Sequence, residues 1–200
     1  MAETAATPSV ERVWDPLVRL THWTIATAVL LNGLVVDDAS LAHIWIGYAA
    51  LAFLALRLVW GVIGTEEARF SSFPPSLSAA AGHIGDLFMG KRREYRSHNP
   101  LGALMVYALW GTLLVVSVTG VLLESAPFPA FEHSGYASEA YEYEDNDGAE
   151  VIEDIHEGAA NLLLLLAALH VGGVALESHL SGVNLVRSMV TGIRPRRKDV

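Results

Sequence analysis

The chain has 200 residues, of which 52% are hydrophobic, and its formal net charge is −9 at neutral pH. It contains no cysteine, which excludes disulfides, thiolate metal sites and iron–sulfur clusters. The apolar residues form four blocks that are long enough to cross a bilayer, at about residues 20–36, 43–64, 101–123 and 155–176. These blocks predict an all-α integral membrane four-helix bundle, built as a single domain over residues 1–200.

The charges are segregated along the chain, and this predicts the orientation of the helices. Loop 65–100 contains five Lys and Arg residues and five more follow residue 176, whereas residues 37–42 and 124–154 contain twelve acids and no Lys or Arg. Because cytoplasmic loops carry an excess of basic residues, both termini and loop 65–100 are expected in the cytoplasm. Residues 1–10 are polar and acidic, so the first span is expected to remain as an uncleaved anchor.

The residues before the first predicted span are typical of the N-terminus of a helix. Asp15 suits the N-cap and Pro16 the first helical position, while Trp14 and Trp23 suit the headgroup region. His22 then lies just inside the cytoplasmic boundary. Taken alone, it is as compatible with a side chain that snorkels to the interface as with a ligand.

The second predicted span begins at His43, near the outer surface, and Arg57 follows 14 residues later on the same helical face. A guanidinium at membrane depth keeps its charge, so it faces a bundle interior, a water-filled cavity or an anion. A salt bridge and snorkelling to the surface are the plain interpretations of Arg57. Contact with an anionic cofactor group, such as a carboxylate, is the sharper hypothesis.

Loop 65–100 and the third span offer no ligand candidate. The basic cluster at 91–96 follows apolar residues 87–89 and is expected to lie on anionic lipid, and nucleic-acid binding is not expected. His98 has no histidine at a matching spacing and is expected to be solvated. The third span contains glycines at nine-residue intervals, which are expected to allow close approach of a helix or a flat ring: Gly102, Gly111 and Gly120.

The predicted outer loop, residues 124–154, is strongly acidic and low in apolar residues. A solvated, partly disordered segment is the plain interpretation of this composition. The ligand spacing of an EF-hand calcium loop is absent. An acidic face that steers a basic redox partner is the functional alternative.

The fourth span carries two histidines, His156 and His170, separated by 14 residues. This separation is close to four helical turns, so both imidazoles lie on one face, about 21 Å apart along the axis. An imidazole inside a membrane is costly to bury and needs a partner. Two of them at opposite depths indicate two metal centres in a row.

The predicted depth of each histidine in the membrane groups the four histidines of the spans into two pairs. His22 and His170 lie toward the cytoplasmic side, and His43 and His156 lie toward the outer side. Two histidines on facing helices at one depth can supply both axial ligands of a haem. Zinc is a weaker alternative because it usually takes four ligands, and a proton relay would need carboxylates at depth, which the spans almost lack.

Short segments between Arg12 and Arg194 are distinctive: Trp14-Asp-Pro, Thr21-His-Trp, His43-Ile-Trp-Ile-Gly-Tyr, Arg57-Leu-Val-Trp-Gly, Ala68-Arg-Phe, His98-Asn-Pro-Leu-Gly and Asn184-Leu-Val-Arg. Together with His156-Glu and Leu169-His they resemble the prokaryotic cytochrome b561 family, which includes the b-type cytochromes of nickel–iron hydrogenases. The long acidic outer loop departs from the shorter loop of that family.

The resemblance implies a bundle that holds two haem b groups, with bis-histidine ligation from the first, second and fourth helices. Carried over by position, the axial ligands are His22 with His170 on the cytoplasmic side and His43 with His156 on the periplasmic side. Arg57 and Arg19 are the candidates for contacts to haem propionates. The implied location is the bacterial inner membrane, as a multi-pass protein.

The implied function is electron transfer across the membrane, between quinone or quinol and a periplasmic or membrane-bound redox protein. That partner is a hydrogenase, a c-type cytochrome or a small reductant or oxidant, and a homodimer of the chain is an open alternative. Haem with two histidine ligands has no open site, which favours an electron carrier over a catalyst and leaves quinone oxidoreduction as the open enzymatic role. The rival hypothesis is a haem-free membrane transporter or assembly subunit with structural histidines.

Overall fold

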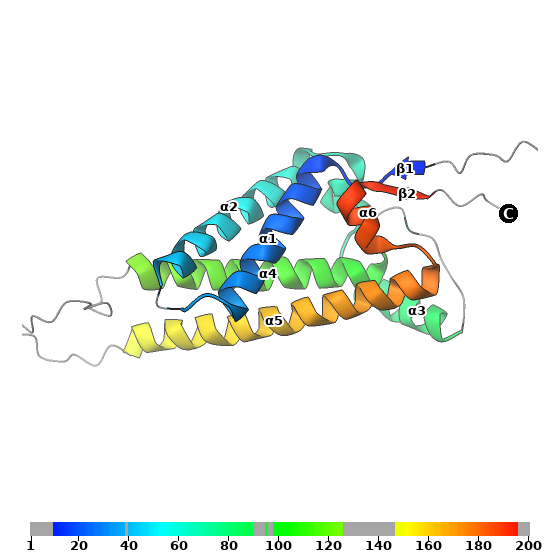
Figure 1. The fold of residues 1–200 in the computed structure, drawn as a ribbon. Coiled ribbons are helices and arrows are strands. Elements are labelled where there is room, and N and C mark those ends of the chain that lie inside the picture. The colour runs from blue at the N-terminus through cyan, green and yellow to red at the C-terminus, as the bar shows by residue number, and fades with distance from the viewer. Residues whose placement is uncertain (1–9, 39, 90–94, 96–97, 126–146, 196–200) are drawn as a thin grey trace, which may run out of the picture.

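The computed structural model describes residues 10–38, 40–89, 95, 98–125 and 147–195, and these are mostly helical (Figure 1). The long helices are α1 (Pro16–Leu34), α2 (Leu41–Ile63), α4 (Pro100–Ser125) and α5 (Asp147–Ser181). The short elements are β1 (Val10–Arg12), η1 (Glu66–Ala68), η2 (Phe70–Ser72), α3 (Leu77–Phe88), α6 (Leu185–Thr191) and β2 (Ile193–Pro195).

The long helices form two layers. Helix α4 packs along α5, and α1 packs along α2 at an inclination to them (Figure 1). The layers meet at an apolar core to which α2, α4 and α5 each contribute one buried leucine, Leu54, Leu113 and Leu163. The predominantly helical architecture is therefore confirmed for the described residues.

Three helices within the described ranges are long and apolar enough to cross a membrane: Leu41–Ile63, Pro100–Glu124 and Gly148–Ser181. The first predicted span, residues 20–36, falls largely in α1, which has 19 residues. Such a helix is about 28 Å long, but it carries Arg19 and several Thr residues that lower its hydropathy. Whether α1 crosses the membrane stays a prediction.

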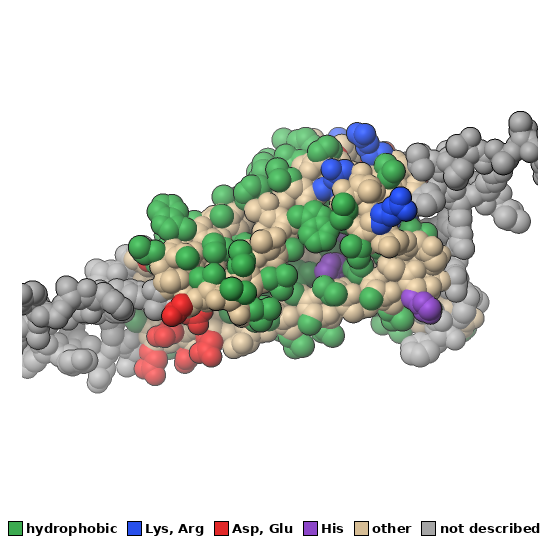
Figure 2. All heavy atoms as spheres, in the orientation of Figure 1, with side chains coloured by type: hydrophobic (Ala, Val, Ile, Leu, Met, Phe, Trp, Pro, Cys, Tyr) green, Lys and Arg blue, Asp and Glu red, His purple; other side chains and the backbone are tan. Residues whose placement is uncertain are grey.

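Helix α5 begins at Asp147, eight residues before the predicted span and inside the predicted outer loop. Its 35 residues extend about 52 Å, well beyond the roughly 30 Å hydrocarbon core. Glu150, Glu153 and Asp154 lie exposed in its first turns, where carboxylates complement the helix dipole. Figure 2 shows acidic side chains gathered at this end of the molecule and arginine side chains at the other end.

The start of α1 is tied to the end of α2 through Asp15. One carboxylate oxygen of Asp15 accepts hydrogen bonds from the backbone N–H groups of Leu17 and Val18, each at 2.9 Å, as expected for an N-cap. The other accepts from Trp60 Nε1 at 3.0 Å and from Thr65 Oγ1 at 2.6 Å. The prediction that Asp15 is the N-cap is confirmed. Because the cap sets where α1 begins, it also sets the position of His22 on that helix.

The two described chain ends lie side by side (Figure 1). Strands β1 and β2 pair antiparallel, with Glu11 opposite Arg194. Gly192 ends α6 at a φ of 80°, a left-handed conformation that favours glycine, and its carbonyl accepts from the N–H groups of Val13 and Trp14. This arrangement brings the C-terminal segment against the start of α1.

The basic cluster predicted to lie on lipid, residues 91–96, falls outside the described residues except for Tyr95. Helix α3, which precedes it, packs on α4. Most of the predicted acidic loop, residues 126–146, also lies outside the described residues.

Candidate metal centres

The fold brings the four predicted histidines together as two pairs. His22 on α1 and His170 on α5 have ring centroids 6.4 Å apart, and His43 on α2 and His156 on α5 have centroids 6.3 Å apart. The rings are inclined at 57° and 62°, so neither pair is stacked. The pairing predicted from membrane depth therefore corresponds to proximity in space.

This separation fits one metal ion between each pair. An imidazole nitrogen lies about 1.1 Å from its ring centre, given ring bonds of about 1.35 Å, and a metal–imidazole bond measures about 2.0–2.1 Å. Two imidazoles on opposite sides of one ion would thus have centroids about 6.3 Å apart. Direct ring packing without an ion brings aromatic centroids to about 4.5–7 Å, so the distance is compatible with contact but matches ligation closely.

The outer pair has polar neighbours. His156 Nδ1 lies 2.9 Å from Thr119 Oγ1 on α4. His43 Nδ1 is buried, has no hydrogen-bond partner within the described ranges and lies 3.7 Å from a carboxylate oxygen of Asp38. Asn32 Nδ2 on α1 donates to the backbone carbonyl of His43 at 2.9 Å, which joins the end of α1 to the start of α2.

The inner pair has mainly apolar and aromatic surroundings. His22 Nδ1 is buried without a hydrogen-bond partner among the described residues, and the indole of Trp23 lies edge-on at 5.1 Å. The preceding Thr21 is fully buried and donates back to the carbonyls of Leu17 and Val18. No polar side chain of the described residues thus hydrogen-bonds to His22 Nδ1.

The described residues contain no group of three or more His, Cys, Asp or Glu side chains that could hold a metal ion. Each centre therefore offers two protein ligands. Two imidazoles suit a metal that receives its remaining ligands from a cofactor, such as the equatorial nitrogens of a haem.

The two arginines predicted as anion contacts are both partly satisfied. Arg57 is 4% exposed, donates from Nη2 to the carbonyl of Ala68 at 3.1 Å and lies over the ring of Trp110 at 4.8 Å. Its Nη1 is buried and has no hydrogen-bond partner among the described residues. Arg19 Nη1 donates to the carbonyl of Thr191 at 2.8 Å, and its Nε is also buried with no partner in the described part of the chain. Each side chain thus keeps one donor for another acceptor.

The prediction that His98 is solvated is wrong. Its ring lies 4.7 Å from the ring of Phe73 and 5.2 Å from that of Trp14. Burial, followed by the nearby charge of Arg57, lowers the pKa of His98 to about 4. The aromatic partners lie far away in the sequence, and for this reason histidine spacing alone did not reveal the contact.

The glycines of the third span have different environments. At Gly120, an added Cβ would lie 3.1 Å from Cε1 of His156, so this glycine does permit close approach of a ring. At Gly102, the nearest atom is the amide oxygen of Asn99 at 3.2 Å. Among the described residues, no neighbouring element lies within 4 Å of such a Cβ at Gly111, so close helix packing is not found there and the approach of a flat ring stays a prediction.

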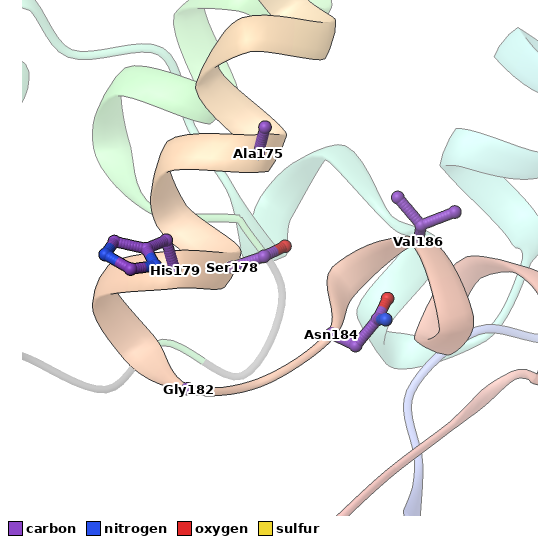
Figure 3. Close-up of a pocket in the computed structure, with 6 residues that line it drawn as sticks. All are labelled: Ala175, Ser178, His179, Gly182, Asn184 and Val186. Carbon is purple, nitrogen blue, oxygen red and sulfur yellow. The ribbon is translucent and has the colours of Figure 1, made fainter.

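A separate open pocket of about 500 Å³ lies where α5 meets α6 (Figure 3). Asn184 and Val186 line it from the α6 side, and His179 and Ser178 from the end of α5. The pocket contains none of the four paired histidines. No motif or residue spacing predicted this pocket.

The fold and the paired histidines define a helical membrane protein with two candidate metal centres in its bundle. The family model of prokaryotic cytochrome b561 matches residues 13–192. The chain therefore belongs to the prokaryotic cytochrome b561 family, a multi-pass bacterial membrane protein family of b-type cytochromes that bind haem b and transfer electrons. Comparisons with curated proteins and with solved structures gave no match.

Proposed function

We propose that this chain is a di-haem cytochrome b that carries electrons across the bacterial inner membrane. The centroid separations of 6.4 and 6.3 Å in the two histidine pairs support this most directly. Haem b supplies a one-electron iron couple when bound, and two histidines fill both of its axial positions. The proposed ligand pairs are His22 with His170 and His43 with His156.

The shared helix α5 supports a transmembrane path. His156 and His170 lie on one face of an uninterrupted helix, about 21 Å apart along its axis. The centres would therefore lie at two membrane depths at a separation that a rigid helix maintains. Because histidines would occupy both axial positions of each bound haem, an electron carrier is favoured over an enzyme that activates a substrate at the metal.

Arg57 and Arg19 are proposed to hold haem propionates. Each has a buried guanidinium nitrogen without a hydrogen-bond partner among the described residues. A carboxylate is the acceptor that best satisfies such a donor, because both charge and hydrogen bonding are then matched. Arg57 would serve the inner centre, since it lies 14 residues after His43 on α2, about 21 Å along the helix axis from the outer pair.

The charge distribution supports a four-span topology with both termini in the cytoplasm. The basic residues lie at the end where β1 and β2 meet, and the acidic side chains lie at the start of α5 (Figure 2). This topology requires α1 to cross as the fourth span, with its polar side facing the bundle.

We propose a quinone or quinol as the partner within the membrane and a basic periplasmic redox protein as the partner outside it. Large exposed apolar side chains on α2 and α5, such as Trp45, Val59 and Leu165, support contact with lipid. The acidic first turns of α5 lie near His156 in sequence and support electrostatic attraction of a basic partner.

The test is the haem content of purified single variants. The unaltered chain should bind two haems with b-type reduced-minus-oxidised bands. His22→Ala and His170→Ala should lose the same haem, while His43→Ala and His156→Ala should lose the other. His179→Ala, an exposed histidine on the same helix, is the matched control and should retain both. A colourless protein would favour the haem-free transporter or assembly subunit instead.

A further inference from the structure

Thr119 on α4 makes a side-chain hydrogen bond to a proposed haem ligand. Its side chain is 8% exposed, and Oγ1 lies 2.9 Å from His156 Nδ1 on the neighbouring helix. The same oxygen lies 2.8 Å from the backbone carbonyl of Val115 and 3.1 Å from that of Val116. The hydroxyl is thus surrounded by two carbonyl oxygens and one ring nitrogen.

This set of neighbours determines which ring nitrogen of His156 carries hydrogen. A hydroxyl has one hydrogen to donate, and carbonyl oxygens can only accept. The hydroxyl of Thr119 donates to the carbonyls of its own helix, so its lone pair accepts from His156 Nδ1–H. A neutral imidazole that carries hydrogen on Nδ1 has its free lone pair on Nε2, which is then available to a metal.

Gly120 leaves room for the ring of His156 to lie within hydrogen-bond distance of Thr119 Oγ1. A Cβ at residue 120 would lie 3.1 Å from Cε1 and 3.6 Å from Nδ1 of His156, so the ring lies close against the surface of α4. Any side chain here would displace the ring away from Thr119. The Thr119–Gly120 pair therefore supplies both the acceptor and the space for one orientation of the imidazole.

We propose that Thr119 is a positioning residue that fixes the tautomer and the orientation of His156 as an axial ligand, an inference that rests on the proposed function. Hydrogen bonding of the second ring nitrogen raises the basicity of a metal-bound histidine. A more basic ligand stabilises the ferric form and so lowers the reduction potential. At the inner centre, the buried His22 Nδ1 has no such partner among the described residues. The hydrogen bond to Thr119 therefore distinguishes His156 of the outer pair from His22 of the inner pair.

The experiment is a redox titration of the full-length, haem-loaded protein and its Thr119→Val, Thr119→Ser and Thr112→Val variants. Valine keeps the shape of threonine without an acceptor, serine restores the hydroxyl, and Thr112 lies two turns earlier on the same face of α4 as the control. In Thr119→Val, the ratio of ferric to ferrous stability at one haem should fall by up to about tenfold. That change raises one of the two potentials by up to about 59 mV. Serine and the Thr112 control should leave both potentials unchanged.

Electron paramagnetic resonance of the ferric protein provides a second measurement. Thr119→Val should alter the g values of one low-spin signal only, and Gly120→Ala should alter the same signal because it moves the same ring. If Thr119→Val does not fold, the Gly120→Ala spectrum and the Thr119→Ser potentials still test the proposal.

The proposal is overturned if Thr119→Val leaves both potentials and both signals unchanged, if it changes the haem that His22→Ala removes, or if Thr119→Ser behaves like Thr119→Val. These outcomes differ from a failure of the proposed function, which would appear in the unaltered chain as fewer than two haems or as the absence of low-spin bis-histidine signals.

Discussion

Removal of the Asp15 carboxylate should loosen α1 and release the inner haem first. Asp15 accepts four hydrogen bonds, two from the first turn of α1 and two from Trp60 and Thr65 at the end of α2. Loss of an N-cap costs about 1 kcal/mol, and a hydrogen bond to a charged group contributes about 1.5–3 kcal/mol. Because Trp60 and Thr65 are near water and can be resolvated, Asp15→Ala should destabilise the protein by about 2–4 kcal/mol in total.

The pH dependence of this effect follows from the pKa of Asp15. Burial raises that pKa, but the hydrogen bonds from Thr65, Trp60 and the backbone outweigh it, so the folded-state pKa lies below the ordinary value of 3.8. A carboxyl with a lowered pKa stabilises the fold above its unfolded-state pKa, and this contribution is lost as the pH falls through the folded-state value. Asp15→Asn should therefore be less stable than the unaltered chain at pH 7 and approach it below about pH 4.

The assay is thermal release of haem in detergent, followed at the absorbance of each of the two proposed haems. Asp15→Ala should lower the temperature at which the His22/His170 haem is lost more than that of the His43/His156 haem, because Asp15 lies seven residues before His22 on α1. Glu66→Ala, an exposed acid at the same end of the molecule, is the matched control. Equal lowering for both haems, or no change for either, would refute the link between Asp15 and the placement of α1.

Two further predictions concern the half-buried His98 and the buried Gly61, at the same end of the bundle. His98 is held neutral by burial to a pKa of about 4, against 6.5 in the unfolded chain, so stability should fall by roughly 2–3 kcal/mol between pH 6.5 and 4. His98→Phe should flatten this dependence in thermal melts, and a slope that persists would contradict it. Gly61→Ala should cost about 1–3 kcal/mol because its Cβ would overlap the ring of Phe70, whereas Gly111→Ala, with open space, should be neutral or slightly stabilising. Equal melting temperatures for the two glycine variants would show that Phe70 yields without cost.

The histidine pairs were predictable from the sequence because they depend on two regular patterns. Helical periodicity places His156 and His170 on one face, and the segregation of charge assigns each histidine a depth. Neither pattern requires knowledge of side-chain contacts. The pairs found at 6.4 and 6.3 Å therefore follow from secondary structure and topology alone.

Contacts between residues distant in sequence were not predictable in the same way. Thr119 was not predicted because it is not itself a metal ligand. A hydroxyl that orients a ligand on another helix produces no periodic pattern in the sequence. His98 was missed because Trp14 and Phe73 reach it from other elements. The early start of α5 was missed because its acidic residues are typical of a loop, although acids in a first turn also stabilise a helix.

The way the helices are joined explains why each centre depends on different residues. Helix α5 supplies one histidine to each pair and fixes their separation, so the second histidine of each pair must be positioned by α1 or α2. These two helices are tied to each other at both ends, by Asp15 at one end and by Asn32, which donates to the carbonyl of His43, at the other. Loss of one tie leaves the other in place. We therefore expect a change at Asp15 to act on His22 while Asn32 continues to hold His43 opposite His156.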